Sequence, residues 1–263
     1  MQSHKAHVTT DDHHLTLTAG ARLLWSIAWA AVDRIQAFKL DLITADEVCL
    51  EFLTGETSYV VDEEVTGWNQ LLETLSDRYR VAQEWAEIVI AQAFATNRTV
   101  LWDRDVAQAQ DRLAILPIEQ LWDRFRTDGA SPDIVVTATA VQDWNDMIAI
   151  VRGTFGFVDV TCHGEFLAHG LTSRHFHGEH RAELRFRAGD IAVAGHCLQE
   201  SQIELRIGPH DVHSSHDLAV LLRLIVVMAV FLRKPVAIAM DRVALFEASP
   251  SGDVHSIGSA MNR

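Results

Sequence analysis

Hydrophobic residues near the N-terminus alternate with polar ones and then change to a helical spacing. Leu15 and Leu17 alternate with threonines, a period of two that is typical of a half-buried strand. Further strands are predicted over 32–42, 48–52 and 58–62, separated by polar turns. A helix capped by Thr66 is predicted next, and its buried stripe consists of Trp68, Leu71, Leu72, Leu75 and Tyr79. A second helix is predicted over 81–94, whereas the residues before Leu15 are expected to be loosely ordered.

A similar order of strands and helices recurs in the second half of the chain. A strand over 134–139 leads to an amphipathic helix, for which Thr139 and Gln142 fit a capping box. Three strands of alternating polarity are predicted next, over 158–162, 184–186 and 203–207, with a further strand over 191–194 between the last two. A long apolar helix over 218–232, capped by Ser214 or Ser215, then precedes two closing strands.

The stretch between the two halves differs in composition. Residues 103–133 contain a charged, alanine-rich run, an interrupting Pro117 and the loop sequence TDGASPD. We therefore expect a domain over 1–103, a helical linker over 104–132, a second domain over 133–250 and a flexible tail over 251–263. The predicted fold class is α+β, with two domains that each pack an antiparallel sheet with amphipathic helices.

The composition supports this class and narrows the choice of partners. The chain has 263 residues, 48% of them hydrophobic, which is enough material for packed cores. Its 36 Asp and Glu against 22 Lys and Arg give a net charge of −14, which repels nucleic acids and anionic membranes and attracts basic proteins. Three scattered cysteines do not make a disulfide framework, no signal peptide is readable, and the apolar helix over 218–232 contains Arg223. The expected location is the cytoplasm, without nucleic-acid or membrane partners.

Motifs of nucleophilic or nucleotide chemistry are missing from the sequence. It contains no G-x-S-x-G elbow and no glycine-rich phosphate loop. The acidic run Asp62-Glu63-Glu64 is interpreted as a solvated turn before the first helix. No cofactor and no catalytic residue are therefore predicted.

Histidine is the one over-represented reactive residue, and its densest cluster is His175-Phe176-His177-Gly178-Glu179-His180. The cluster resembles the H-x-H-x-D-H motif of metallo-β-lactamase-like hydrolases, in which such histidines gather metal ions that activate water. The context differs, because no buried strand precedes the motif and only 83 residues follow it. A metal site of another kind would combine His175 and His177 with His180 or His163. The alternatives are a mobile polar loop that tolerates histidine, or a pH sensor.

Residues 24–79 resemble a known family. The residues that carry the resemblance are Ile35-Gln36-Ala37-Phe38-Lys39, Asp46, the strand Val48 to Phe52, and Glu64 followed by Gly67-Trp68. They resemble the small pleckstrin-homology-like (PH-like) domains of bacterial proteins, some of which are regarded as immunity proteins of interbacterial toxins. The basic lobe that phosphoinositide-binding relatives use is missing. The resemblance implies a PH-like N-terminal domain and a protein partner, and it implies no catalytic residue.

These observations favour a non-enzymatic protein that binds another protein. The preferred hypothesis is a bacterial immunity protein that neutralises a basic toxin, because opposite charges accelerate and orient the encounter. One alternative is a metal-dependent hydrolase that uses His175, His177 and His180. Another is a scaffold subunit of a larger assembly, for which Trp25 and Trp29 on one face of a predicted strand would supply an exposed apolar patch.

Overall fold

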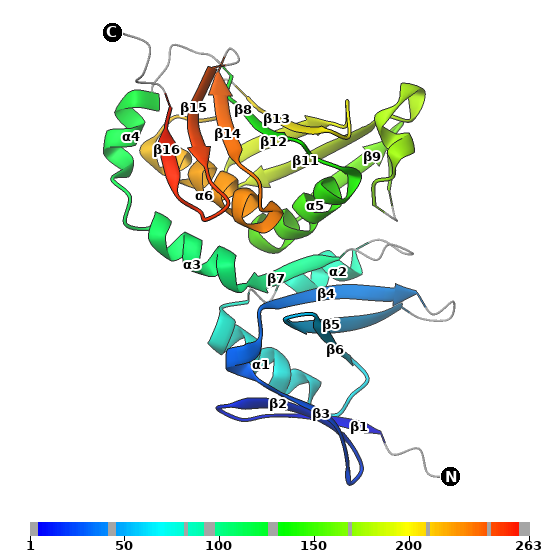
Figure 1. Cartoon of the computed structure of the whole chain (residues 1–263). Helices are drawn as coiled ribbons and strands as arrows, with labels where there is room; N and C mark the ends of the chain where they lie inside the picture. The colour runs from blue at the N-terminus through cyan, green and yellow to red at the C-terminus, as the bar shows by residue number, and fades with distance from the viewer. Residues whose placement is uncertain are drawn as a thin grey trace. The chain divides into compact units, whose positions relative to one another are not determined.

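A computed structural model describes residues 5–41, 46–81, 84–91, 98–125, 131–167, 170–208, 211–240 and 243–257. Contacts within the chain divide it into two compact units, residues 1–104 and residues 105–263. The architecture is mixed α and β, with three antiparallel sheets among the described residues (Figure 1). The predicted α+β class is confirmed at this level.

The first unit begins with a three-stranded antiparallel meander. Its strands are β1 (Ala6–Thr10), β2 (His14–Ala19) and β3 (Arg22–Ala28). Leu15 and Leu17 of β2 are buried, and the threonines between and after them lie on the opposite face, as the alternation predicts. The expectation of a loose segment before Leu15 is wrong, because β1 pairs with β2 and buries Val8.

A second sheet in this unit has four strands in the order β6-β5-β4-β7. The strands are β4 (Arg34–Asp41), β5 (Asp46–Thr54), β6 (Thr57–Asp62) and β7 (Thr99–Asp103). The first three confirm the strands predicted over 32–62, whereas β7 has no counterpart among the predictions. Ile35, Leu50 and Phe52 are fully buried between this sheet and the rest of the unit's core.

Helices cover the core of the first unit. The helical segments are η1 (Trp29–Ala31), α1 (Trp68–Tyr79) and α2 (Trp85–Ile90). Helix α1 buries Leu71 and Leu75, as predicted, but its cap is Gly67 rather than Thr66. The second predicted helix is shorter than 81–94, and residues 92–94 lie outside the described residues.

Trp25 and Trp29 do not form the apolar patch predicted for a scaffold subunit. Trp29 follows the end of β3 in the short helical turn η1, where it is buried against Phe52 and Tyr79. Trp25 is half-buried and packs on Tyr59. The break between β3 and η1 therefore separates the two tryptophans that the alternation places on one strand.

The second unit contains one sheet of nine antiparallel strands in the order β10-β9-β11-β12-β13-β8-β14-β15-β16. Its strands are β8 (Asp133–Thr137), β9 (Val158–Cys162), β10 (Glu165–Phe166), β11 (Ala182–Ala188), β12 (Ile191–His196), β13 (Gln202–Ile207), β14 (Val236–Met240), β15 (Val243–Ala248) and β16 (Val254–Ser256). The predicted strands of this half are confirmed. Strand β16 lies in the predicted flexible tail and pairs with β15, so this part of the tail prediction is wrong.

Two long helices pack on one face of this sheet (Figure 1). They are α5 (Val141–Phe155) and α6 (Ser215–Leu232). The cap of α5 is Ala140 with Asp143, not Thr139 with Gln142, because the hydroxyl of Thr139 donates to the carbonyl of Glu200. Among the described helices, α6 alone is long and apolar enough to cross a membrane, and 61% of it is buried within the structure. Burial of this extent is typical of an apolar helix in a protein core.

Two further helices, α3 (Arg104–Leu113) and α4 (Ile118–Phe125), occupy the predicted linker. Helix α4 packs against α6, and its Phe125 lies 6.1 Å from Phe246 between ring centroids. The contacts therefore assign residues 105–125 to the second unit, whereas the sequence pattern predicts a separate linker over 104–132.

Candidate functional site

An acidic groove of about 550 Å³ lies in the first unit between the β1–β2 connection and helix α1. The residues that line it are Thr10, Asp11, Asp12, Gln70, Glu73, Thr74, Asp77 and Arg78. Four of these side chains are carboxylates and one is a cation. Glu73 and Asp77 are one helical turn apart and therefore share a face of α1.

Hydrogen bonds fix the β1–β2 side of the groove. The carboxylate of Asp11 accepts the backbone N–H groups of His13 and His14, both at 2.7 Å. These two hydrogen bonds hold the pKa of Asp11 below its usual value, so the group is ionised at neutral pH. The carbonyl of Asp11 accepts the indole N–H of Trp29 at 2.9 Å, which ties the turn to the buried core.

The cation of the groove is engaged with its own surroundings. Nη2 of Arg78 donates to the carbonyl of Asp12 at 2.9 Å. Its guanidinium also lies over the ring of Trp29, 5.3 Å from the centroid. Arg78 thus contacts the residues that form the groove. The four carboxylates outnumber this one cation, so the electrostatic potential of the groove is negative.

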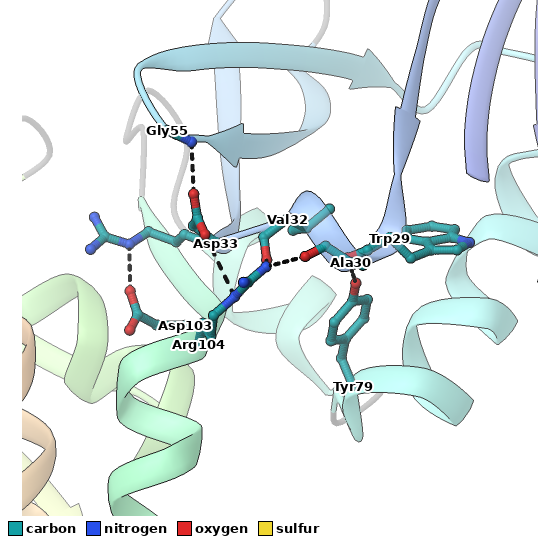
Figure 2. Close-up of polar contacts among 9 residues, drawn as sticks. Trp29, Ala30, Val32, Asp33, Gly55, Tyr79, Asp103 and Arg104 are labelled. Carbon is teal, nitrogen blue, oxygen red and sulfur yellow. Dashed lines mark hydrogen bonds and ion pairs between the residues drawn. The ribbon is translucent and has the colours of Figure 1, made fainter. Parts of the chain in front are cut away.

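A polar network behind Trp29 supports this arrangement (Figure 2). The hydroxyl of Tyr79 donates to the carbonyl of Trp29 at 3.1 Å, and burial raises the pKa of Tyr79 to about 12, so the hydroxyl keeps its proton. Nη2 of Arg104 donates to the carbonyls of Ala30 and Val32, both at 2.6 Å. The network links η1 to the end of α1 and to the start of α3. We interpret it as structural support for the groove.

Two aspartates complete this network by pairing with arginines. Asp33 lies 3.5 Å from Nε of Arg104, and its carboxylate accepts the N–H of Gly55 at 2.7 Å (Figure 2). Asp103 accepts Nε of Arg34 at 2.8 Å. The charges balance within the network, which therefore adds nothing to the negative field of the groove.

A second group of acidic side chains lies in the same unit, at the paired ends of β5 and β6. Burial raises the pKa of Glu47, and the nearby charges of Asp62, Glu64 and Glu63 raise it further. Glu63 accepts the N–H of Val48 at 2.9 Å, and Glu64 is exposed. Lys5 lies 3.8 Å from Glu64, and the remaining carboxylates make this edge a second concentration of negative charge in the first unit.

The three histidines predicted as metal ligands do not converge. His175 is 3% exposed, and its Nδ1 accepts the N–H of Thr172 at 2.9 Å. Burial lowers the pKa of His175, and the positive charges of Arg174 and His180 add to this shift. The side chain of His177 is 76% exposed and lies 4.0 Å from Glu200. His180 lies instead with Cys162 and His163, which form the one three-residue group of metal-ligand type among the described residues.

Three further histidines, His210, His213 and His216, lie in the sequence around the start of helix α6. His213 donates its backbone N–H to Asp217 at the start of α6. His210 lies outside the described residues. His213 thus stabilises the start of α6 through its backbone N–H group, not through its imidazole.

A hollow of about 730 Å³ on the second unit has an apolar lining that includes Phe155 and Phe157. Three arginines border it, and each has a partner: Arg185 pairs with Glu183, Arg206 with Glu204, and Arg187 donates to the carbonyl of Asp190. The charges of Arg185 and Arg206 are therefore compensated by carboxylates, whereas Arg187 is hydrogen-bonded to a neutral carbonyl. The hollow has no catalytic set of its own among its lining residues.

Sequence reasoning missed the acidic groove because its residues come from segments about 60 positions apart. The spacing of Glu73 and Asp77 on the predicted helix was the one available signal. No family model, curated protein or solved structure matches this chain. The resemblance of residues 24–79 to PH-like domains stays a prediction.

Proposed function

We propose that the protein is a non-enzymatic binding protein whose acidic first unit captures a basic protein partner. The observation that carries this proposal is the groove of Asp11, Asp12, Glu73 and Asp77, which presents four carboxylates beside one engaged cation. A bacterial toxin of basic charge is the partner class that we propose, with neutralisation of that toxin in the cytoplasm as the biological role.

Charge explains why such a partner is favoured. Residues 1–104 contain sixteen Asp and Glu against eight Lys and Arg, so the first unit carries more than half of the net charge of −14. A field of one sign accelerates association with an oppositely charged protein by about 10- to 1000-fold and weakens steeply with salt. The same field repels nucleic-acid phosphates and anionic lipid head groups.

We also propose that the first unit is a PH-like domain and that the chain has two domains. In support, α1 directly follows β6, packs against β1 of the three-stranded sheet, and places Tyr79 on Trp102 of the four-stranded sheet. A PH-like scaffold without a basic lobe suits protein binding better than phosphoinositide binding, because a lipid head group needs cations.

The test compares partner capture by three forms of the full chain. The groove variant carries Asp12→Asn, Glu73→Gln and Asp77→Asn, which are exposed positions without a core role. Its matched control carries Glu56→Gln, Glu84→Gln and Asp190→Asn, which change the net charge equally at exposed positions outside the groove. Each form is used to retain proteins from lysate of the native host, which are identified by mass spectrometry and purified for rate measurements.

We expect the parent and the control to retain the same basic protein and to release it at high salt. The groove variant should associate with it at least about tenfold more slowly at low salt. Equal association by all three forms would exclude the groove as the contact surface. Absence of any basic partner of the parent would contradict the proposed function itself.

A further inference from the structure

Cys162, His163 and His180 bring one sulfur and two imidazoles together at the end of β9. A ligand atom of each residue lies within 4.8 Å of those of the other two. The rings of His163 and His180 are nearly perpendicular, with centroids 5.8 Å apart. In a tetrahedral site with Zn–S about 2.3 Å and Zn–N about 2.0–2.1 Å, the ligand atoms stand about 3.3–3.6 Å apart. Cys162 is half-buried and both histidines are exposed, so their side chains have room to rotate toward a shared ion.

The turn that carries two of these residues is built for a tight hairpin. Cys162 of β9 lies opposite Glu165 of β10, and only His163 and Gly164 connect them. Both connecting residues have left-handed backbone angles, φ 55° for His163 and 77° for Gly164. Two left-handed residues define the hairpin turn that matches strand twist, and histidine tolerates this region better than most side chains.

The segment that carries His180 is held on the other side of Cys162. Strand β11 pairs with β9, so that Ala182 lies opposite Cys162, and the thiol of Cys162 donates to the carbonyl of His180 at 3.2 Å. His180 ends the short helical turn η3 (Gly178–His180), which follows η2 (Ser173–Phe176). The backbones of both ligand-bearing segments are thus fixed by the sheet.

Residues that precede His180 contact helix α5. The rings of Phe176 and Trp144 pack edge to face with centroids 5.5 Å apart. The side chain of Asn145 accepts the N–H of Leu171 at 2.8 Å and donates to its carbonyl at 3.1 Å. His175 and Phe176 of the histidine-rich stretch are therefore buried against the protein, whereas His177 and His180 are exposed.

We propose that Cys162, His163 and His180 bind one transition-metal ion of the zinc class, with water in the fourth position. A thiolate with two neutral imidazoles is a ligand set that suits zinc and related ions. Binding displaces the thiol proton, so that one proton is released to solvent as the metal–sulfur bond forms. This site is independent of the acidic groove, because its residues belong to the second unit.

Cys162 is the one cysteine that is accessible for this role. Cys49 and Cys197 are buried, and burial raises the pKa of each thiol to about 12. Their burial keeps both sulfur atoms away from an ion that approaches from solvent. A metal–thiolate signal from this protein would therefore report on Cys162.

The test is a cobalt titration of the metal-depleted full chain, followed by competition with zinc. Cobalt bound to a thiolate gives a charge-transfer absorption that cobalt bound to histidines alone does not give. We expect this absorption to saturate at one equivalent of cobalt and to disappear when zinc is added. Affinity should fall as the pH is lowered, because protons compete for the sulfur and the imidazoles.

Three variants and one control identify the ligands. Cys162→Ser should abolish the charge-transfer absorption. His180→Ala should weaken cobalt binding by more than about 100-fold, because loss of a residue that only hydrogen-bonds to a ligand costs at most about 100-fold. His163→Asn should weaken binding equally while keeping the hairpin, because Asn-Gly favours the same left-handed turn. His177→Ala is the matched control and should bind cobalt as the parent does, since His177 points to Glu200.

Melting temperatures in the presence of a chelator separate ligand loss from misfolding. All four variants change partly or fully exposed side chains and should melt within a few degrees of the parent. The proposal is overturned when no thiolate absorption develops, when it survives Cys162→Ser, or when His163→Asn and His180→Ala bind as tightly as the parent. Cobalt held only by other histidines, without the absorption, would also overturn it.

Discussion

A single backbone position decides where helix α1 begins. Gly67 has φ 94°, and a Cβ at this residue would stand 2.2 Å from the carbonyl oxygen of Val8. The close approach arises because β1 runs alongside the segment before α1: Val8 donates to the carbonyl of Thr66 at 2.9 Å, and Thr66 donates to that of Ala6 at 3.0 Å. Glycine is the only residue that satisfies both the backbone angle and the space.

Gly67→Ala is expected to lower the free energy of unfolding by about 2–4 kcal/mol, because the left-handed angle and the clash add to each other. Gly55→Ala is the matched control, since its φ is 57° and no atom lies within 4 Å of the added Cβ. It should cost about 1 kcal/mol, for the backbone angle alone. Urea denaturation of both variants measures the difference. Equal losses would show that the contact with Val8 is not limiting.

At the scale of elements, the start of helix α6 depends on a reciprocal cap. The N–H of Asp217 donates to Oγ of Ser214 at 3.2 Å, and the Asp217 carboxylate accepts the N–H groups of His213 and Ser214 at 2.9 and 3.0 Å. Burial raises the pKa of Asp217, but the hydrogen bonds from His213 and Ser214 outweigh burial and lower it overall. The ionised carboxylate therefore stabilises the helix that forms the core of the second unit.

Asp217→Ala should lower the free energy of unfolding by about 1 kcal/mol at pH 7, the usual value of an N-terminal cap. A folded pKa below the unfolded one means that this stabilisation is complete above the unfolded pKa and is lost as the pH falls through the folded pKa. The difference in the free energy of unfolding between parent and variant should consequently become smaller below about pH 4. Denaturation at several pH values tests this, with Asp111→Ala in α3 as an exposed control. A gap that is constant with pH would exclude the carboxylate as its source.

Helices and strands whose own apolar residues recur at a regular spacing were predictable from sequence, as the buried residues of α1 and α5 illustrate. Elements that exist through a partner were not: β1 is ordered by pairing with β2, and the two residues of β10 by pairing with β9. The Ser214 cap of α6 was predicted, but two other helix starts were not. The backbone of Thr66 pairs with β1, and the hydroxyl of Thr139 donates to the carbonyl of Glu200. The candidate groove unites segments about 60 residues apart, and such contacts leave no local pattern.

At the scale of the whole molecule, the two units differ in surface charge and in the composition of their cores. The first unit concentrates acidic side chains around a groove, whereas the second buries its apolar helix α6 under α4 and against a nine-stranded sheet. The proposed binding surface and the proposed metal site thus belong to different compact units. Each core should respond to damage on its own, because most contacts lie within a unit.

Hydrogen exchange measured by mass spectrometry can test this independence with the two destabilising variants. Gly67→Ala should accelerate exchange in peptides from residues 5–104 and leave those from 133–250 unchanged. Asp217→Ala should have the opposite effect, since its cap stabilises α6 alone. Gly55→Ala and Asp111→Ala serve as controls of small effect in each unit. Faster exchange across both units in either variant would mean that the two cores unfold together, and the proposed division into two domains would then be wrong.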